Sequence, residues 1–473
     1  MSTQPTPSFV RRSVYGPEPK QRAATLPGLV GLEIKRLFPD VPEAIYLEGG
    51  DLAAMREATR AALRDVRMDM IREGHSVNIL ASQYGFTLMG GYAYAEMLKT
   101  IKDVVRERTG CKKIRLRVCT GFRIREPDEI IQHYGLEESF PHAAAAVRPI
   151  DKGIPIETEI GTLYGVAKVY DADWIIHAHH GELRELDMHR MINRAHKPFA
   201  MSYARMETRA VAHMNFGPRS SNFIAKVIFD SRFVQSKFTF GCFMLTSPQG
   251  ITGVAAGSDL DALDRKLMLV GFKSYGKIRE LFAEIKECIA VLDATGEPRY
   301  MIGGGLTFGN VTEAELDLFD LDMMPVSLGF GLYERPPHQP RAKSVNPALK
   351  ALVINHMWLG VPQLELATHI PTIAVGQDMA RLLRDDPMNH DFMRHCVTAE
   401  NLETAMKFAR AIARTDNVIV FDGSFGRMTV SPPLAEHLTA RAPDVSRRVD
   451  EQLMPKWLRQ RGIDPAAAAQ VAM

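Results

Sequence analysis

Three histidines stand within four positions of one another in the stretch DWIIHAHH, residues 173–180. On an extended strand His177 and His179 point to one side and His180 to the other. Imidazole binds nickel, zinc or copper, and it takes up and returns protons near neutral pH. The histidines follow a short apolar run, so we expect them at or just past the carboxyl end of a strand. A polar loop with coincidental histidines is the alternative, and the clustering favours a functional site.

A second candidate is the loop SQYGFTLMGG, residues 82–91, which follows the apolar strand VNILA. Gly90 and Gly91 stand at the start of a predicted helix, where free backbone N–H groups suit a phosphate or carboxylate. A flexible connection between strand and helix is the alternative.

The third candidate is the loop TGFRIREP, residues 120–127. Arg123 and Arg125 stand at alternate positions and could clamp a carboxylate through paired hydrogen bonds. They could equally form surface ion pairs with Glu126 and Asp128.

Helical and strand-like segments alternate around these loops, which predicts mostly parallel sheets covered by helices. The first helix begins at the N-cap Asp51 and ends at Gly74. The next predicted elements are a strand at 76–81, a helix at 92–110, a strand at 114–119, a helix from Pro127 and a strand at 173–178. In such folds ligands lie outside the carboxyl ends of the strands, which is why these loops matter.

With 473 residues the chain is long enough for two domains. We expect an α/β protein made of two Rossmann-like domains with an interdomain cleft. A flexible arm takes residues 1–28, and the N-terminal domain at 29–262 carries most of the candidate site. The C-terminal domain takes 263–440, and a helix and tail take 441–473.

The composition argues against several classes of partner. The net charge of +2 gives no reason to expect nucleic acid or an anionic membrane. No apolar run is long enough to cross a bilayer, and the first residues lack the apolar core of a signal peptide. Five scattered cysteines fit a reduced, cytoplasmic protein. A homo-oligomer is compatible with this composition.

The order of these segments resembles the nickel-dependent lactate racemase family. The resemblance lies in residues 77–135 with their TGF turn, in the segment from DADWIIHAHH to SYARMETRAVAH, and in residues 401–430. Together these cover about half of the chain. Arg123 stands where the family has a catalytic histidine.

The resemblance implies two α/β domains and a nickel–pincer nucleotide held on a lysine. It places His179 or His180 as an acid/base histidine and His213 as a nickel ligand, with His177 as a second metal-binding candidate. Lys197 is the candidate for a tethered cofactor. Tyr84 lies in the loop that contacts substrate in the family.

Three functions follow as hypotheses. The first is a racemase or epimerase acting on a 2-hydroxy acid or sugar acid, with Arg123 or Arg125 on the carboxylate. The second is a lyase or hydrolase in which the histidines bind another divalent metal and no nucleotide is present. The third is a non-catalytic protein that binds a carboxylate.

Overall fold

The computed structural model describes residues 19–83, 85–86, 91–120, 126–181, 195–215, 217–293, 317, 319–322, 347–356, 370–385 and 396–466. These residues form two compact units, and each is described by itself. The first comprises residues 44–246 and 250–270, and the second comprises 19–43, 247–249 and the described residues from 271 onward.

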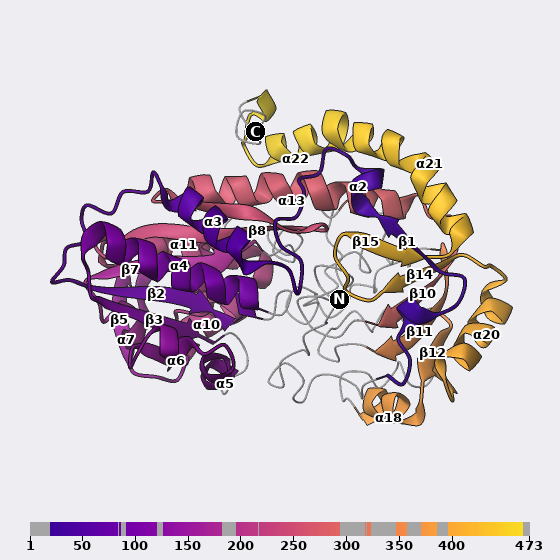
Figure 1. Ribbon diagram of the computed structural model, residues 1–473, viewed down its shortest axis with the longest axis horizontal. Coiled ribbons are helices and arrows are strands. Elements are labelled where there is room, and N and C mark those ends of the chain that lie inside the picture. Colours follow the sequence, from indigo (N-terminus) through magenta and orange to yellow (C-terminus); the bar gives the residue numbers. More distant parts are fainter. Residues whose placement is uncertain are drawn as a thin grey trace. The chain divides into compact units, whose positions relative to one another are not determined.

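The first unit is built on a six-stranded sheet with the order β4-β3-β2-β7-β8-β9. Its strands β2, β3, β7 and β8 are labelled in Figure 1. Neighbouring strands from β4 to β8 run parallel. The strands are β2 (Ser76–Ser82), β3 (Lys113–Cys119), β4 (Ala144–Val147), β7 (Trp174–His180), β8 (Phe238–Ser247) and β9 (Gly250–Gly257). A separate antiparallel pair is formed by β5 (Gly153–Thr158) and β6 (Gly161–Val166).

Helices of the first unit connect these strands. They are α3 (Leu52–Leu63), α4 (Tyr92–Thr109), α5 (Glu126–His133), α6 (Leu136–Ser139), α7 (Ala167–Tyr170), α9 (Lys197–Ala200), α10 (Met206–Ala210), the π-helix η3 (Val211–Asn215), α11 (Gly217–Asp230) and α12 (Arg232–Gln235). The long helix α13 (Leu260–Ala283) contributes residues to both units.

The second unit has a seven-stranded sheet with the order β1-β15-β14-β10-β11-β12-β13. Its strands are β1 (Val30–Glu33), β10 (Cys288–Asp293), β11 (Leu349–His356), β12 (Thr372–Val375), β13 (Cys396–Ala399), β14 (Val418–Phe421) and β15 (Arg427–Val430). Strands β14, β10, β11, β12 and β13 run parallel, whereas β1 and β15 pair antiparallel at one edge.

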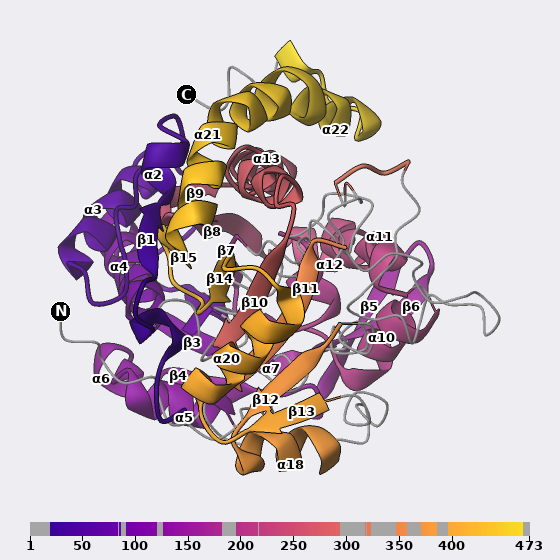
Figure 2. The same cartoon turned by 90° about the vertical axis from the view of Figure 1, so that its right-hand side faces the viewer.

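The helices of the second unit are η1 (Ala23–Thr25), α2 (Ile34–Leu37), α18 (Gln377–Asp385), α20 (Leu402–Ala413), α21 (Pro432–Arg448), the π-helix η5 (Val449–Leu453) and α22 (Met454–Gln460). Helix α20 packs against β10, β11 and β12 (Figure 2). The middle strands β10 and β11 are buried along almost their whole length, as expected for parallel strands covered on both faces.

The predicted α/β fold with mostly parallel sheets is confirmed. The strands at β2, β3 and β7 and the helix ending at Gly110 are where the sequence placed them. The interdomain cleft stays a prediction. No helix within the described residues is long and apolar enough to span a membrane.

The first helix ends earlier than its apolar pattern predicts. Asp51 is its N-cap as expected, and its carboxylate accepts a hydrogen bond from the Ala53 N–H at 2.8 Å. The helix ends at Leu63 instead of Gly74, because Arg108 of α4 donates to the carbonyls of Leu63 at 2.6 Å and Val66 at 2.8 Å. A guanidinium from another helix thus satisfies carbonyls that a further turn would have used.

Candidate functional site

The carboxyl ends of three parallel strands lie side by side in the first unit. Ser82 at the end of β2 is paired with Cys119 at the end of β3, and the neighbouring Ala81 is paired with Ala178 of β7. The residues that follow these ends therefore gather at one edge of the sheet, which we call the histidine edge. Its strand β7 carries all three clustered histidines.

His177 lies inside strand β7 and is fully buried. Its Nε2 is 2.9 Å from the Ala195 carbonyl, which can only accept, so Nε2 carries the proton. Its Nδ1 then accepts from the Tyr203 hydroxyl at 2.6 Å. Burial lowers the pKa of His177 to about 3, so the ring is neutral across the physiological range. Both nitrogens are used within the fold, and this geometry gives no support to the metal-ligand role predicted for His177.

His179 and His180 occupy the last two positions of β7 and are both buried. Their ring centroids are 4.8 Å apart. His180 Nδ1 is 2.9 Å from the Gly181 carbonyl, which places the proton on Nδ1 and the lone pair on Nε2. The imidazole of His180 is thus oriented by a backbone carbonyl, an arrangement that suits a general base.

The ring of Phe243 lies against two of the histidines. Its centroid is 4.9 Å from that of His177 and 6.0 Å from that of His179. Because the same ring contacts both His177 and His179, these alternate positions of the strand face the same side, as expected. Strand β8 therefore supplies an apolar wall for this side of β7.

A buried polar network adjoins the same edge. Thr120 Oγ1 donates to Gln83 Oε1 at 3.0 Å, and Gln83 Nε2 donates to Glu126 at 3.1 Å. Arg209 of α10 donates to the Thr120 carbonyl at 2.9 Å. All four side chains are at least nine-tenths buried. Such a group of donors and one carboxylate can orient a small polar ligand.

Sequence reasoning missed this network, although its residues follow the flagged strands directly. Glu126 is the expected partner of Arg123 and Arg125 in one alternative. Its side chain is buried and accepts from Gln83, and its pairing with those arginines stays a prediction. Asp128, the other proposed partner, pairs with Arg148. The sequence feature that indicates this network is the position of Gln83 and Thr120, which directly follow the paired last residues of β2 and β3.

Gly91 caps the amino end of helix α4 with a left-handed backbone, at φ +77°. A Cβ atom there would lie 2.1 Å from the Phe86 carbonyl oxygen and 2.3 Å from the Tyr134 hydroxyl. Close packing therefore accounts for this glycine, and its predicted anion-binding role stays a prediction. Gly90 lies outside the described residues.

The remaining predicted residues are less fully described. Lys197 begins helix α9, whose Phe199 packs against the ring of His177 with centroids 5.5 Å apart. His213 lies in the π-helix η3, but its side chain is not among those described. Tyr84, Arg123 and Arg125 lie outside the described residues.

The nickel centre that the family resemblance implies stays a prediction, because the side chain of its candidate ligand His213 lies outside the described part of the chain. His177 has both ring nitrogens occupied, as shown above. Within the described part of the chain, no group of three or more histidine, cysteine, aspartate or glutamate side chains is arranged to hold a metal ion.

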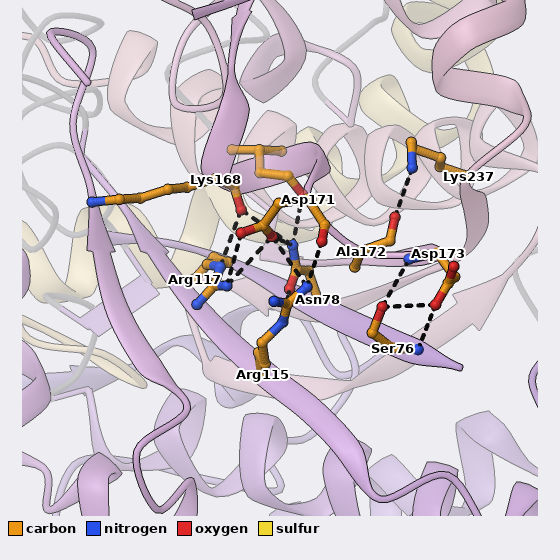
Figure 3. A network of polar contacts seen from close by, with 10 residues as sticks. Ser76, Asn78, Arg115, Arg117, Lys168, Asp171, Ala172, Asp173 and Lys237 are labelled. Atoms are coloured by element: carbon orange, nitrogen blue, oxygen red, sulfur yellow. Dashed lines mark hydrogen bonds and ion pairs between the residues drawn. The ribbon is translucent and has the colours of Figure 1, made fainter. Parts of the chain in front are cut away.

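The amino end of β7 is fixed by a second polar network, shown in Figure 3. Asn78 of β2 is fully buried and donates to the carbonyls of Lys168 and Val169 and to the Asp171 carboxylate, at 2.8–3.1 Å. Two arginines of β3, Arg115 and Arg117, also reach Asp171. These contacts hold the end of α7 and the turn before β7, and so position the strand that carries the histidines.

The fold and the histidine edge together define a class: an α/β protein with polar side chains at the carboxyl ends of parallel strands. No family model matches the chain, and a search of curated proteins finds no match. Among solved structures, it is similar to the lactate racemase apoprotein from Thermoanaerobacterium thermosaccharolyticum. The sequence identity is 14%, the TM-score is 0.48, and the match covers 87% of this chain and 98% of that chain.

Proposed function

We propose that the chain is a racemase or epimerase acting at the hydroxyl-bearing carbon of a small 2-hydroxy acid or sugar acid. The observation that carries this proposal is the pair of adjacent buried imidazoles, His179 and His180, at the carboxyl end of β7. Inversion at such a carbon requires a group that removes the proton of its C–H bond and a group that returns a proton to the opposite face. An imidazole does this near neutral pH.

The role of each residue follows from its surroundings. His180 presents Nε2 as the basic nitrogen, because Nδ1–H is committed to the Gly181 carbonyl. In the proposed reaction Nε2 removes the proton from the hydroxyl-bearing carbon, and the electron pair of that C–H bond passes to the substrate carboxylate as an enediolate. The protonated second histidine then returns a proton to the opposite face of the carbon, and proton exchange with solvent restores both imidazoles. His179 is the second proton-exchanging candidate, and the Gln83–Glu126 hydrogen bond lies at the same edge of the sheet. Arg123 or Arg125 is proposed to hold the substrate carboxylate.

The test uses single enantiomers of lactate and of several sugar acids, incubated with the purified protein in D₂O. Chiral separation should reveal the opposite configuration. Deuterium at the inverted carbon would indicate proton abstraction there, whereas retention of the original hydrogen would indicate its transfer within the active site. Elemental analysis and intact mass, measured on the same sample, would reveal nickel and an adduct at Lys197.

Matched variants connect the activity to the histidines. We expect His179→Ala and His180→Ala to lower turnover by about 10²–10⁴-fold, as is usual for a lost acid/base group. His142→Asn is the control, because His142 is exposed and has the left-handed backbone that asparagine tolerates.

Other outcomes would change the assignment. Full turnover in both alanine variants would remove these histidines from the mechanism. Binding of a hydroxy acid without any inversion would favour the non-catalytic carboxylate-binding hypothesis. A bound metal without an adduct, together with bond cleavage, would favour the lyase or hydrolase.

A further inference from the structure

The start of the described chain is fastened to the carboxyl ends of two strands in the second unit. The Ala23 N–H donates to Asp293 Oδ2 at 2.7 Å, and Asn355 Nδ2 donates to the Gln21 carbonyl at 2.8 Å. The Arg22 guanidinium lies 3.4 Å from Asp293 Oδ1. Asp293 ends β10, and Asn355 is the next-to-last residue of the neighbouring strand β11.

This edge is the side on which parallel α/β sheets bind ligands. Three neighbouring strands end there with titratable groups. Asp293 of β10 is paired with His356 of β11. On the other side, Leu292 of β10 is paired with Phe421 of β14, and Asp422 follows Phe421. We propose that residues Gln21–Ala23 form an internal strap across this ligand-binding edge, with Asp293 as its latch. The inference goes beyond the proposed racemase and does not rest on it.

The strap has one polar and one apolar attachment. Ala23 is fully buried and belongs to the core formed by β10, β11, β12, β14 and α20, and Leu26 and Leu29 pack against the same core. Asp293 and Asn355 bind the polar side and also each other, through Asn355 Nδ2 and Asp293 Oδ1 at 2.8 Å. Opening of Gln21–Ala23 can therefore occur while Leu26 and Leu29 remain in place.

The charge of Asp293 sets how firmly the strap is held. Burial raises its pKa to about 6, and the Asp422 carboxylate adds to this rise, whereas Ala23, Arg22 and Asn355 oppose it. Within the described residues, the titratable groups beside Asp293 are Arg22, Asp422 and His356 on β11. With the strap open, water would return the pKa toward the ordinary 3.8. The closed state of the strap therefore favours the protonated form of Asp293. As a consequence, the closed state is most stable below pH 4 and becomes less stable as pH rises through 6.

Hydrogen exchange measured by mass spectrometry tests this in the full-length protein. The readout is the protection factor of amides in a peptide covering residues 19–27, corrected for intrinsic exchange at each pH. Between pH 4 and pH 8 we expect protection to fall, by at most on the order of 100-fold. Asp293→Asn keeps the shape and an acceptor for Ala23 without the charge, so its profile should be flat and protected at pH 8.

Two further variants complete the test. Asp416→Asn removes an exposed aspartate of the same unit and should keep the wild-type profile. Arg22→Gln changes a part-exposed side chain and should lower protection at pH 8, where Asp293 is charged, but not at pH 4. A wild-type profile that does not change with pH, or a pH dependence that survives in Asp293→Asn, would overturn the proposal.

Discussion

His177 is held by two hydrogen bonds that use both of its ring nitrogens. Its folded pKa of about 3 lies below the ordinary 6.5, so between these values the unfolded chain binds a proton that the folded chain does not. Stability is therefore full above pH 6.5 and falls as pH drops toward 3. From pH 7 to pH 4.5 this one residue should cost about 2–3 kcal/mol of unfolding free energy.

Urea unfolding of His177→Phe at both pH values checks this. At pH 7 the variant should be less stable by roughly 2–4 kcal/mol, because the Ala195 carbonyl and the Tyr203 hydroxyl lose their partner. At pH 4.5 the difference in unfolding free energy between wild type and variant should be smaller, by the stability that His177 costs the wild type between pH 7 and pH 4.5. A difference that stays constant would show that His177 titrates normally in the folded protein. His142→Asn should leave the pH slope unchanged.

Gly91 and Gly110 both have left-handed backbones, and they cap the two ends of helix α4. A Cβ at Gly91 would collide with the Phe86 carbonyl and the Tyr134 hydroxyl, whereas at Gly110 the nearest atom is 3.7 Å away. Gly110→Ala should cost about 1 kcal/mol for backbone strain alone. Gly91→Ala should cost more than about 3 kcal/mol, since the backbone must also shift. Equal losses of thermal stability would contradict this reading.

At the scale of elements, strand β7 is fixed at its start by Asn78 and the residues drawn in Figure 3. Asn78→Leu keeps the volume but removes the donor to the Val169 carbonyl and one of the two donors to the Lys168 carbonyl, which keeps Arg117 Nε at 3.1 Å. We expect a loss of roughly 3 kcal/mol in urea unfolding. Ser76→Ala removes an exposed contact to Asp173 in the same network and should cost less than about 1 kcal/mol. If Asn78→Leu and Ser76→Ala lower the free energy of unfolding by the same small amount, the polar network does not fix the start of β7.

The elements that could be predicted are those whose signal is local. Short apolar runs, the N-cap at Asp51 and the terminal Gly110 are read from adjacent residues, and each is found where expected. The end of α3 depended on Arg108, about 45 residues away along the chain. The short strands β1, β5 and β6 depend on partners that their own sequences do not identify.

At the scale of the whole molecule, the sequence indicated the edge of the sheet but not the state of its side chains. The histidines stood out because three fall within four positions. Nothing local shows that Ala195 and Tyr203 occupy both nitrogens of His177, since those residues arrive 18 and 26 positions later. Glu126 likewise follows two arginines in the sequence, and its hydrogen bond from Gln83 comes from a residue 43 positions earlier.

A buried lysine joins three distant parts of the second unit. Lys277 of α13 is fully buried, and its Nζ lies 2.6 Å from Asp40 and 2.7 Å from Asp450 of η5. Burial acts to raise the pKa of Asp40, but the hydrogen bond and charge of Lys277, with Lys273, outweigh it and lower that pKa. This carboxylate therefore contributes stability that is present above its ordinary pKa and is lost as pH falls through the lowered value.

Lys277→Met should consequently destabilise the protein most at neutral pH, where two charged carboxylates would face each other without their shared cation. We expect a loss of about 2 kcal/mol, below the value for a fully buried pair because both carboxylates are about 40% exposed. As pH falls through the lowered pKa of Asp40, this carboxyl becomes neutral and the stability difference from the wild type should narrow. Lys273→Met, which removes a part-exposed contact to the same Asp40, should cost less than about 1 kcal/mol. Urea unfolding at pH 7 and pH 3.5 distinguishes this from simple loss of packing, which would leave the gap equal at both pH values.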